Sequence, residues 1–194
     1  MQMRPLTRSQ RGMTLIEVLV TIFILAVGLL GMAGLQSRLQ QSEMEAYQRA
    51  QALLLLNDMA NRIALNRNAA ASYVTSAGPL GAGMTCPTAT ATSTQLERDK
   101  SEWCNALQGA GETSGTGTSK VMVGAMIGGR GCVVALGGGG SGEYLVTVAW
   151  QGLTRLAAPP AGVACGVDKY DDGAACTNDQ CRRVVTTKVR VATL

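Results

Sequence analysis

The chain of 194 residues has no histidine and few aromatic residues, and each scarcity excludes a class of function. Without histidine it can form no Ser-His-Asp or Cys-His catalytic arrangement and no histidine-ligated metal site. Aromatic residues make up 4% of the sequence, too few to suggest a platform that stacks nucleic-acid bases. Because the sequence offers no candidate base to activate a nucleophile, we expect no catalytic residues, no enzymatic activity and no cofactor.

Charge is sparse as well, at 15% of residues and a net charge of +4. Three of the 17 basic residues, Arg4, Arg8 and Arg11, lie in the first twelve positions, which leaves 14 basic against 13 acidic residues elsewhere. A nucleic-acid partner is therefore not expected, since it would require a concentrated basic surface.

The 46% hydrophobic content excludes a disordered chain, and the length suits one domain with an appendage.

One long hydrophobic run is present. No charged residue occurs from Val18 to Ser37, and twenty apolar residues at about 1.5 Å per residue span a bilayer core. The basic flank predicts that the N-terminus stays in the cytoplasm, so the chain crosses the membrane once and the residues after 37 are exported. A conventional cleaved signal fits less well, because residues 31–34 match a cleavage site only faintly; an uncleaved signal anchor is the alternative.

Glu17 lies at the edge of this apolar run. Burying a carboxylate there costs on the order of 2–3 kcal/mol, and such residues are usually functional and paired. No Lys or Arg occurs in the next twenty positions. Cleavage after Gly12 would create a new amine at Met13, one helical turn before Glu17, and in a staggered bundle of identical helices that amine could meet a neighbour's carboxylate.

The segment from Arg11 to Val20, RGMTLIEVLV, resembles the class III signal of type IV pilins and pseudopilins. The resemblance implies that a prepilin peptidase cuts between Gly12 and Met13, that Met13 is then N-methylated, and that Glu17 is needed for assembly. Methionine stands where phenylalanine is commoner in the family. A narrower likeness to PilV-class minor pilins is carried by four segments, Ala26–Gln36, Arg130–Val133, Val146–Leu153 and Arg182–Val185.

The next part of the chain predicts a long helix, because no proline occurs between Pro5 and Pro79 and no glycine between Gly34 and Gly78. Apolar residues recur on one helical face after residue 37: Leu39, Ala46, Ala50, Leu53, Leu56, Ala60 and Ile63. We therefore expect a leader at 1–12, a transmembrane and assembly helix at 13–37, its amphipathic continuation at 38–66, and a disulfide-rich periplasmic β head at 67–194.

The head holds all six cysteines, Cys86, Cys104, Cys132, Cys165, Cys176 and Cys181. In an exported chain they predict three disulfides, with fifteen possible pairings. Zinc is the rival reading, but there is no CxxC pair. Adjacency favours Cys86–Cys104 and Cys176–Cys181, and the pairing Cys132–Cys165 is implied by the pilin resemblance.

Sequence patterns predict a helix at 93–107, with Leu96, Trp103 and Leu107 buried, and three or four antiparallel strands. The expected strands are Lys120–Ile127, Gly131–Leu136, Glu143–Gln151 and Val184–Val191. The glycine run 137–142 is read as a hairpin loop, since no Gly-Lys-Ser/Thr follows it. Residues 168–173 partly match a calcium loop, but the third position is tyrosine and no closing glutamate follows, so we expect no metal.

The expected fold is α+β and pilin-like, with a long N-terminal helix packed on a small antiparallel β-sheet head. The expected function is that of a minor pilin in the priming or tip complex of a type IV pilus. Its partners would be the prepilin peptidase and methylase, the inner membrane, other major and minor pilins, and a pilus-tip adhesin. Two alternatives remain open: a minor pseudopilin of a type II secretion system, and a periplasmic binding module or enzyme on an uncleaved membrane anchor.

Overall fold

The computed structural model describes residues 12–76, 78–117, 121–124, 126–137, 142–171 and 176–192. The chain divides into two compact units, one ending at Glu43 and one beginning at Met44, and each is treated separately below. The expected leader lies outside the described residues except for Gly12.

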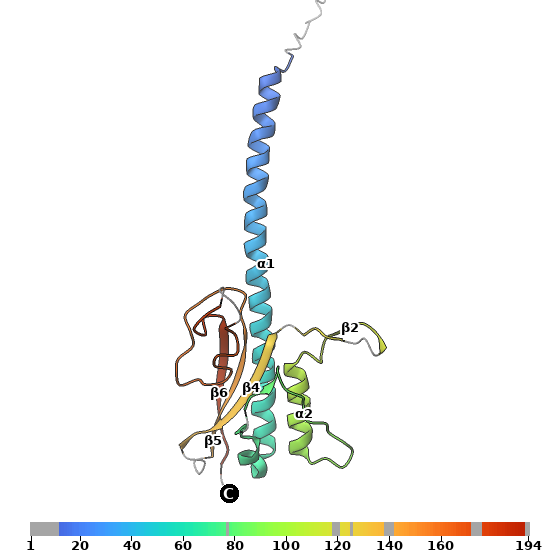
Figure 1. Cartoon of the computed structure of the whole chain (residues 1–194), viewed down its shortest axis with the longest axis vertical. Coiled ribbons are helices and arrows are strands. Elements are labelled where there is room, and N and C mark those ends of the chain that lie inside the picture. Colours follow the sequence, from blue (N-terminus) through green and yellow to red (C-terminus); the bar gives the residue numbers. More distant parts are fainter. Residues whose placement is uncertain are drawn as a thin grey trace, which may run out of the picture. The chain divides into compact units, whose positions relative to one another are not determined.

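The first unit consists of the N-terminal part of helix α1, which as a whole runs from Leu15 to Leu65 (Figure 1). Between Leu15 and Leu35 every large hydrophobic side chain is exposed. An 18-residue window of α1 has a mean hydropathy of 2.6, and none of it is buried inside the protein. This is the one helix in the described part of the chain that is long and apolar enough to cross a membrane.

The second unit, from Met44 onward, is the head (Figure 1). Its main sheet is antiparallel, in the order β1-β4-β5-β6, and its strands are Leu80–Gly81, Ile127–Ala135, Glu143–Gln151 and Arg182–Arg190. Strands β2 (Thr113–Ser114) and β3 (Val121–Met122) form a second, two-stranded sheet. The helical elements are the C-terminal part of α1, the 3-10 helix η1 (Arg67–Tyr73) and α2 (Gln95–Leu107).

One hydrophobic core joins the helices to a face of the main sheet. Strand β5 contributes Tyr144, Val146, Val148 and Trp150, the alternating residues expected to share one face. Helix α2 contributes Trp103, which has no exposed surface and donates a hydrogen bond of 2.9 Å from Nε1 to the carbonyl oxygen of Leu55. The core therefore fixes the C-terminal part of α1 against both α2 and the sheet.

Helix α2 begins where its sequence provides a capping box. The side chain of Thr94 accepts a hydrogen bond from the Glu97 amide, and the Glu97 carboxylate accepts one from the Thr94 amide. These two bonds satisfy amide groups that lack partners at the first turn of a helix. The expected helix at 93–107 is therefore confirmed, with its start shifted to Gln95.

The predicted core face of α1 was partly wrong. Leu56 and Ile63 are buried as expected, but Leu53 is 40% exposed. The residues that α1 buries are Gln48, Ala52, Leu55, Leu56, Met59 and Ile63. Four consecutive leucines at 53–56 point in all directions around the helix, so the apolar pattern could not show which side meets Trp103.

The expected strand Lys120–Ile127 was also wrong, because strand β3 ends at Met122 and β4 begins only at Ile127; Lys120 and Ala125 lie outside the described residues. Between these strands the backbone at Gly124 passes in direct contact with that at Gly109, since a Cβ atom added at Gly124 would lie 2.4 Å from the Cα atom of Gly109. Strand β5 has the expected bounds, and β6 begins two residues earlier than expected.

Candidate functional site

The expected processing and assembly residues lie at the start of α1. Gly12 and Met13 precede the helix, and Met13 is 69% exposed. The Glu17 amide donates a hydrogen bond of 3.0 Å to the Thr14 carbonyl, which places Glu17 in the first turn. A carboxylate at this position interacts favourably with the helix dipole.

Glu17 has no basic partner within the described residues. The large side chains around it, such as Leu15, Ile16 and Leu19, are 62–83% exposed. A helix that is apolar on all sides requires cover from lipid or from other helices. Once so covered, a charged carboxylate needs a cation supplied from outside this segment.

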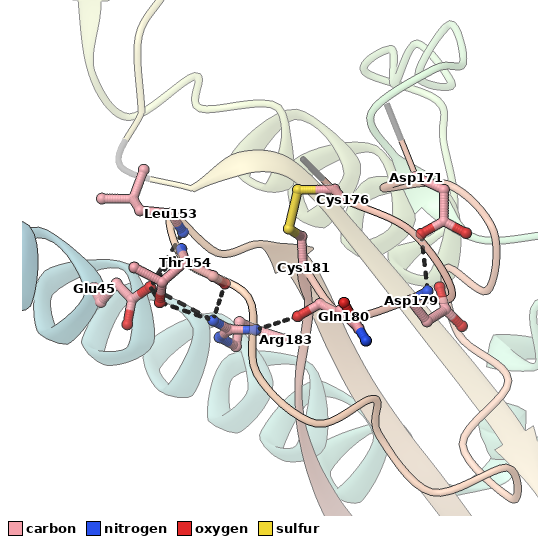
Figure 2. The surroundings of a disulfide bond; sticks show 9 residues. All are labelled: Glu45, Leu153, Thr154, Asp171, Cys176, Asp179, Gln180, Cys181 and Arg183. Carbon is pink, nitrogen blue, oxygen red and sulfur yellow. Dashed lines mark hydrogen bonds and ion pairs between the residues drawn. A yellow bond between two sulfur atoms is a disulfide. The ribbon is translucent and has the colours of Figure 1, made fainter. Parts of the chain in front are cut away.

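The head holds its part of α1 through Glu45 (Figure 2). One oxygen of the Glu45 carboxylate accepts hydrogen bonds from the Leu153 amide, at 3.2 Å, and from the Thr154 amide and hydroxyl, at 3.2 and 2.9 Å. A guanidinium nitrogen of Arg183 lies 3.5 Å from the same oxygen and donates a 2.6 Å hydrogen bond to the Thr154 carbonyl. This cluster ties α1 to the segment after β5 and to the start of β6.

A second polar cluster joins α1 to α2 through Asp99, which is 2% exposed. Its carboxylate accepts hydrogen bonds of 2.8 Å from Arg62 of α1 and Gln95, and one from the Tyr73 hydroxyl. Burial raises the pKa of Asp99, but the hydrogen bonds from Tyr73, Arg62 and Gln95 outweigh burial, so the pKa is lowered overall. Burial and the bond to Asp99 raise the pKa of Tyr73 to about 12. Both groups are therefore held in their pH 7 forms.

The six cysteines form three disulfides: Cys86–Cys104, Cys132–Cys165 and Cys176–Cys181. These are the pairs that adjacency and the pilin resemblance indicated. The first attaches the loop before α2 to that helix, and the second attaches β4 to the long segment between β5 and β6. The third, drawn in Figure 2, closes a short turn just before β6.

Arg182 organises the long segment between β5 and β6 from inside. Its guanidinium is 2% exposed and donates hydrogen bonds of 2.7 and 3.1 Å to the carbonyls of Val163 and Cys165. It also lies 3.0 Å from the Asp179 carboxylate. A buried arginine with these partners fixes an irregular segment that has few strand hydrogen bonds of its own.

Three carboxylates meet in this segment, those of Asp168, Asp171 and Asp179, with oxygens within 4.8 Å of one another. Asp171 and Asp179 each accept a hydrogen bond from a backbone amide, at 2.8 and 3.0 Å, and Asp179 also pairs with Arg182. Residues 172 and 173 of the calcium-like segment 168–173 lie outside the described residues. The carboxylates of Asp171 and Asp179 thus already serve to hold the loop.

Sequence reasoning did not identify Glu45, Asp99 or Arg182 as structural residues. Glu45 bonds residues 108 and 109 positions away, and Asp99 pairs with a residue 37 positions away. No local pattern marks such contacts. The nearest signal was the segment Arg182–Val185, noted for its likeness to minor pilins.

Comparisons with known families agree with this architecture. The family model for the prokaryotic N-terminal methylation motif matches residues 7–33, and the model described as type IV pilin Tt1218 matches residues 34–110. No curated protein matches the chain, and no solved structure does. The two matched regions adjoin, and they cover the apolar part of α1, its continuation in the head, and α2. The chain is therefore a type IV pilin-like protein, with a long N-terminal helix, an antiparallel sheet and three disulfides.

Proposed function

We propose that this chain is a minor pilin of the PilV class, which enters the priming or tip complex of a type IV pilus. The prepilin peptidase cuts between Gly12 and Met13, the methylase modifies the Met13 amine, and the mature subunit waits in the inner membrane with its head in the periplasm. The observation that carries the proposal is Glu17, a carboxylate with no ion-pair partner among the described residues, in a helix segment that is otherwise apolar and uncovered.

Glu17 gives the assembly step its specificity. In a bundle of identical or related helices, the amine of one subunit lies beside the Glu17 carboxylate of its neighbour. A close pair of opposite charges in a low-dielectric surrounding interacts strongly, whereas either charge alone is costly to bury. Pairing therefore favours insertion in one axial register, and a subunit with an intact leader cannot provide the amine at Met13.

The outer surface of the head is the feature that distinguishes this subunit from others. The internal attachments of the head hold α1 to the sheet through Glu45 and to α2 through Asp99, without using the apolar N-terminal segment. The head's outer surface is then available to other major and minor pilins and to a tip adhesin. The role proposed for the chain is structural and involves no catalysis.

The test starts with the processed N-terminus. Mass spectrometry of the membrane-extracted protein should find a mature chain that begins with N-methylated Met13. Gly12→Asp should block cleavage and leave a larger form in the membrane. If cells that make pili retain the first twelve residues on this protein, it is a tethered periplasmic module and not a pilin.

The assembly role is tested with Glu17→Val. This variant should be processed and inserted in the membrane normally, yet be missing from sheared pili. Glu43→Val, which removes an exposed carboxylate from the same helix, is the matched control and should be incorporated normally. Wild-type recovery of Glu17→Val in pili would contradict the assigned role. Co-isolation with type II secretion pseudopilins instead of pilins would assign the chain to that system.

A further inference from the structure

A cavity of about 540 Å³ opens in the head beside β1. Nine residues between Val74 and Met84 form most of its wall. Three basic residues complete the lining: Lys100 from α2, Arg130 from β4, and Lys169 from the segment between β5 and β6. Among the described lining residues none is acidic.

The three cations are placed by different parts of the fold. Lys100 Nζ donates a 2.6 Å hydrogen bond to the Ser72 carbonyl. The Arg130 guanidinium stacks over the Tyr170 ring, 4.9 Å from its centre, and donates a 3.2 Å hydrogen bond to the Gly128 carbonyl. The Tyr170 hydroxyl donates to that same carbonyl at 2.9 Å, so ring and guanidinium are held together. Lys169 is exposed at the rim.

Four arginines elsewhere in the head have carboxylate partners. Arg62, Arg182, Arg183 and Arg190 each form an ion pair. No such pair involves Lys100, Arg130 or Lys169 within the described residues. Outside its first twelve residues the chain has nearly equal numbers of basic and acidic residues. Three cations around one cavity, with no acidic residue in its described lining, therefore give the cavity a positive local potential.

The dimensions and lining suit a small molecule. Ligand cavities commonly enclose roughly 300–1,000 Å³ and combine apolar walls with a few converging polar groups. Here Val74, Pro79 and Leu80 provide apolar surface, and Gly78 and Gly83 leave room for an occupant. A stacked guanidinium presents a planar pair of N–H donors, the geometry that carboxylates and phosphates accept in bidentate fashion.

We propose that this cavity binds a small organic anion that carries two or more carboxylate or phosphate groups. Arg130 takes one anionic group in its plane, and Lys100 and Lys169 take the others. Burial lowers the pKa of Lys100, and a bound anion opposes that effect by favouring the ammonium form. The site is separate from the assembly segment, so it binds its ligand whether or not the proposed pilus function holds.

The test is calorimetric titration of the purified full-length protein in detergent micelles with citrate. Citrate should bind, and triethyl citrate, which has the same skeleton without the charges, should not. Raising the salt from about 50 to 500 mM should weaken binding severalfold, because the cavity is open to solvent. Pyrophosphate, titrated in parallel, shows whether the site prefers phosphate or carboxylate groups.

Variants assign the binding to the cavity. Lys169→Gln should weaken citrate binding about threefold or more, and Lys100→Gln with Lys169→Gln at least tenfold, because each substitution removes one charge–charge contact with the bound anion. Arg155→Gln removes an exposed cation outside the cavity and should leave binding unchanged. Because Lys169 is exposed, its single variant keeps the test valid if the double variant misfolds.

Three results would overturn the proposal. One is the absence of heat for both citrate and pyrophosphate at millimolar concentration. The others are equal binding of citrate and triethyl citrate, and an equal loss of affinity in Lys169→Gln and Arg155→Gln. None of these results bears on cleavage at Gly12 or on pilus incorporation, so the two proposals fail independently.

Discussion

Replacing Gly131 by alanine should destabilise the head, because the strand β4 backbone is packed directly against the Trp103 indole. A Cβ atom at Gly131 would lie 2.2 Å from Cη2 of Trp103, and two further ring carbons would be 2.6 Å away. Real Cβ contacts of this length do not occur, so the ring or the strand must move. Trp103 has no exposed surface and is also hydrogen-bonded to the Leu55 carbonyl, so it has little room to yield.

The expected magnitude follows from two terms. Overpacking a dense core costs about 1–3 kcal/mol. Displacing the indole also strains or breaks a buried hydrogen bond, and an unsatisfied buried group costs about 1–3 kcal/mol. We expect Gly131→Ala to lower the free energy of unfolding by about 3 kcal/mol, which for a protein of this size lowers Tm by roughly 6–12 °C.

Near-ultraviolet circular dichroism of the mature protein follows the unfolding of the head through its tryptophans. Gly162→Ala is the matched control, since its Cβ would meet nothing within 4 Å, and its Tm should be unchanged or slightly higher. A double-mutant cycle with Trp103→Leu tests the contact directly. In the Trp103→Leu protein, Gly131→Ala should lower the free energy of unfolding by less than about 1 kcal/mol, because the two residues are in contact in the wild type. A full cost in both backgrounds, or a Tm of Gly131→Ala equal to that of the control, would refute the steric argument.

Three further outcomes are expected. Replacing the Cys132–Cys165 pair by alanines should destabilise the head by about 3–4 kcal/mol, and replacing the Cys176–Cys181 pair by about 2 kcal/mol, because the closed loops span 33 and 5 residues. Equal urea-unfolding midpoints for the two variants would contradict this. The pKa of Tyr73 is raised to about 12 in the folded state, so its protonated hydroxyl stabilises the fold below pH 10, and this contribution is lost as the pH rises towards 12. Between pH 10 and 12 the wild type should therefore lose on the order of 2 kcal/mol more stability than Tyr73→Phe does. Glu45→Gln should lower stability by about 1–2 kcal/mol, because glutamine keeps the acceptor oxygen but loses the charge that strengthens three hydrogen bonds and the ion pair with Arg183, whereas Glu43→Gln should have no effect.

The parts of the fold that the sequence predicted well are those with local causes. Strand β5 places Tyr144, Val146, Val148 and Trp150 on one face, and its bounds are the expected ones. Helix α2 is marked by its capping box at Thr94 and by buried residues at helical spacing. The apolar N-terminal part of α1 follows directly from twenty residues without charge.

The parts that were missed depend on partners. Strand β1 has two residues, Leu80 and Gly81, and exists because it pairs with β4. The core face of α1 depends on where Trp103 and the sheet meet the leucine run. Gln48 lies in that buried face and is 1% exposed, although its polar side chain would predict a position exposed to solvent. Such placements result from tertiary contacts and leave no periodic trace in the sequence.

The same difference applies to the candidate sites. Gly12, Met13 and Glu17 lie within six consecutive positions, because the proposed cleavage and assembly roles both depend on a short linear segment. Lys100, Arg130 and Lys169 come from three separate elements, and only the fold brings them to one cavity. A motif therefore identifies the assembly segment, whereas the basic cavity is invisible without the structure.

The head's core, ion pairs and disulfides are formed by residues from Glu45 onward. The apolar N-terminal segment buries none of its large side chains within the protein. In the proposed pilin role, lipid before assembly and other helices afterwards would cover these side chains, whereas the core, ion pairs and disulfides of the head are internal. A substitution confined to the N-terminal segment is then expected to leave the stability of the head unchanged. Glu17→Val should accordingly abolish incorporation and leave the Tm of the head unchanged, and a common loss of both would show that the two parts are coupled.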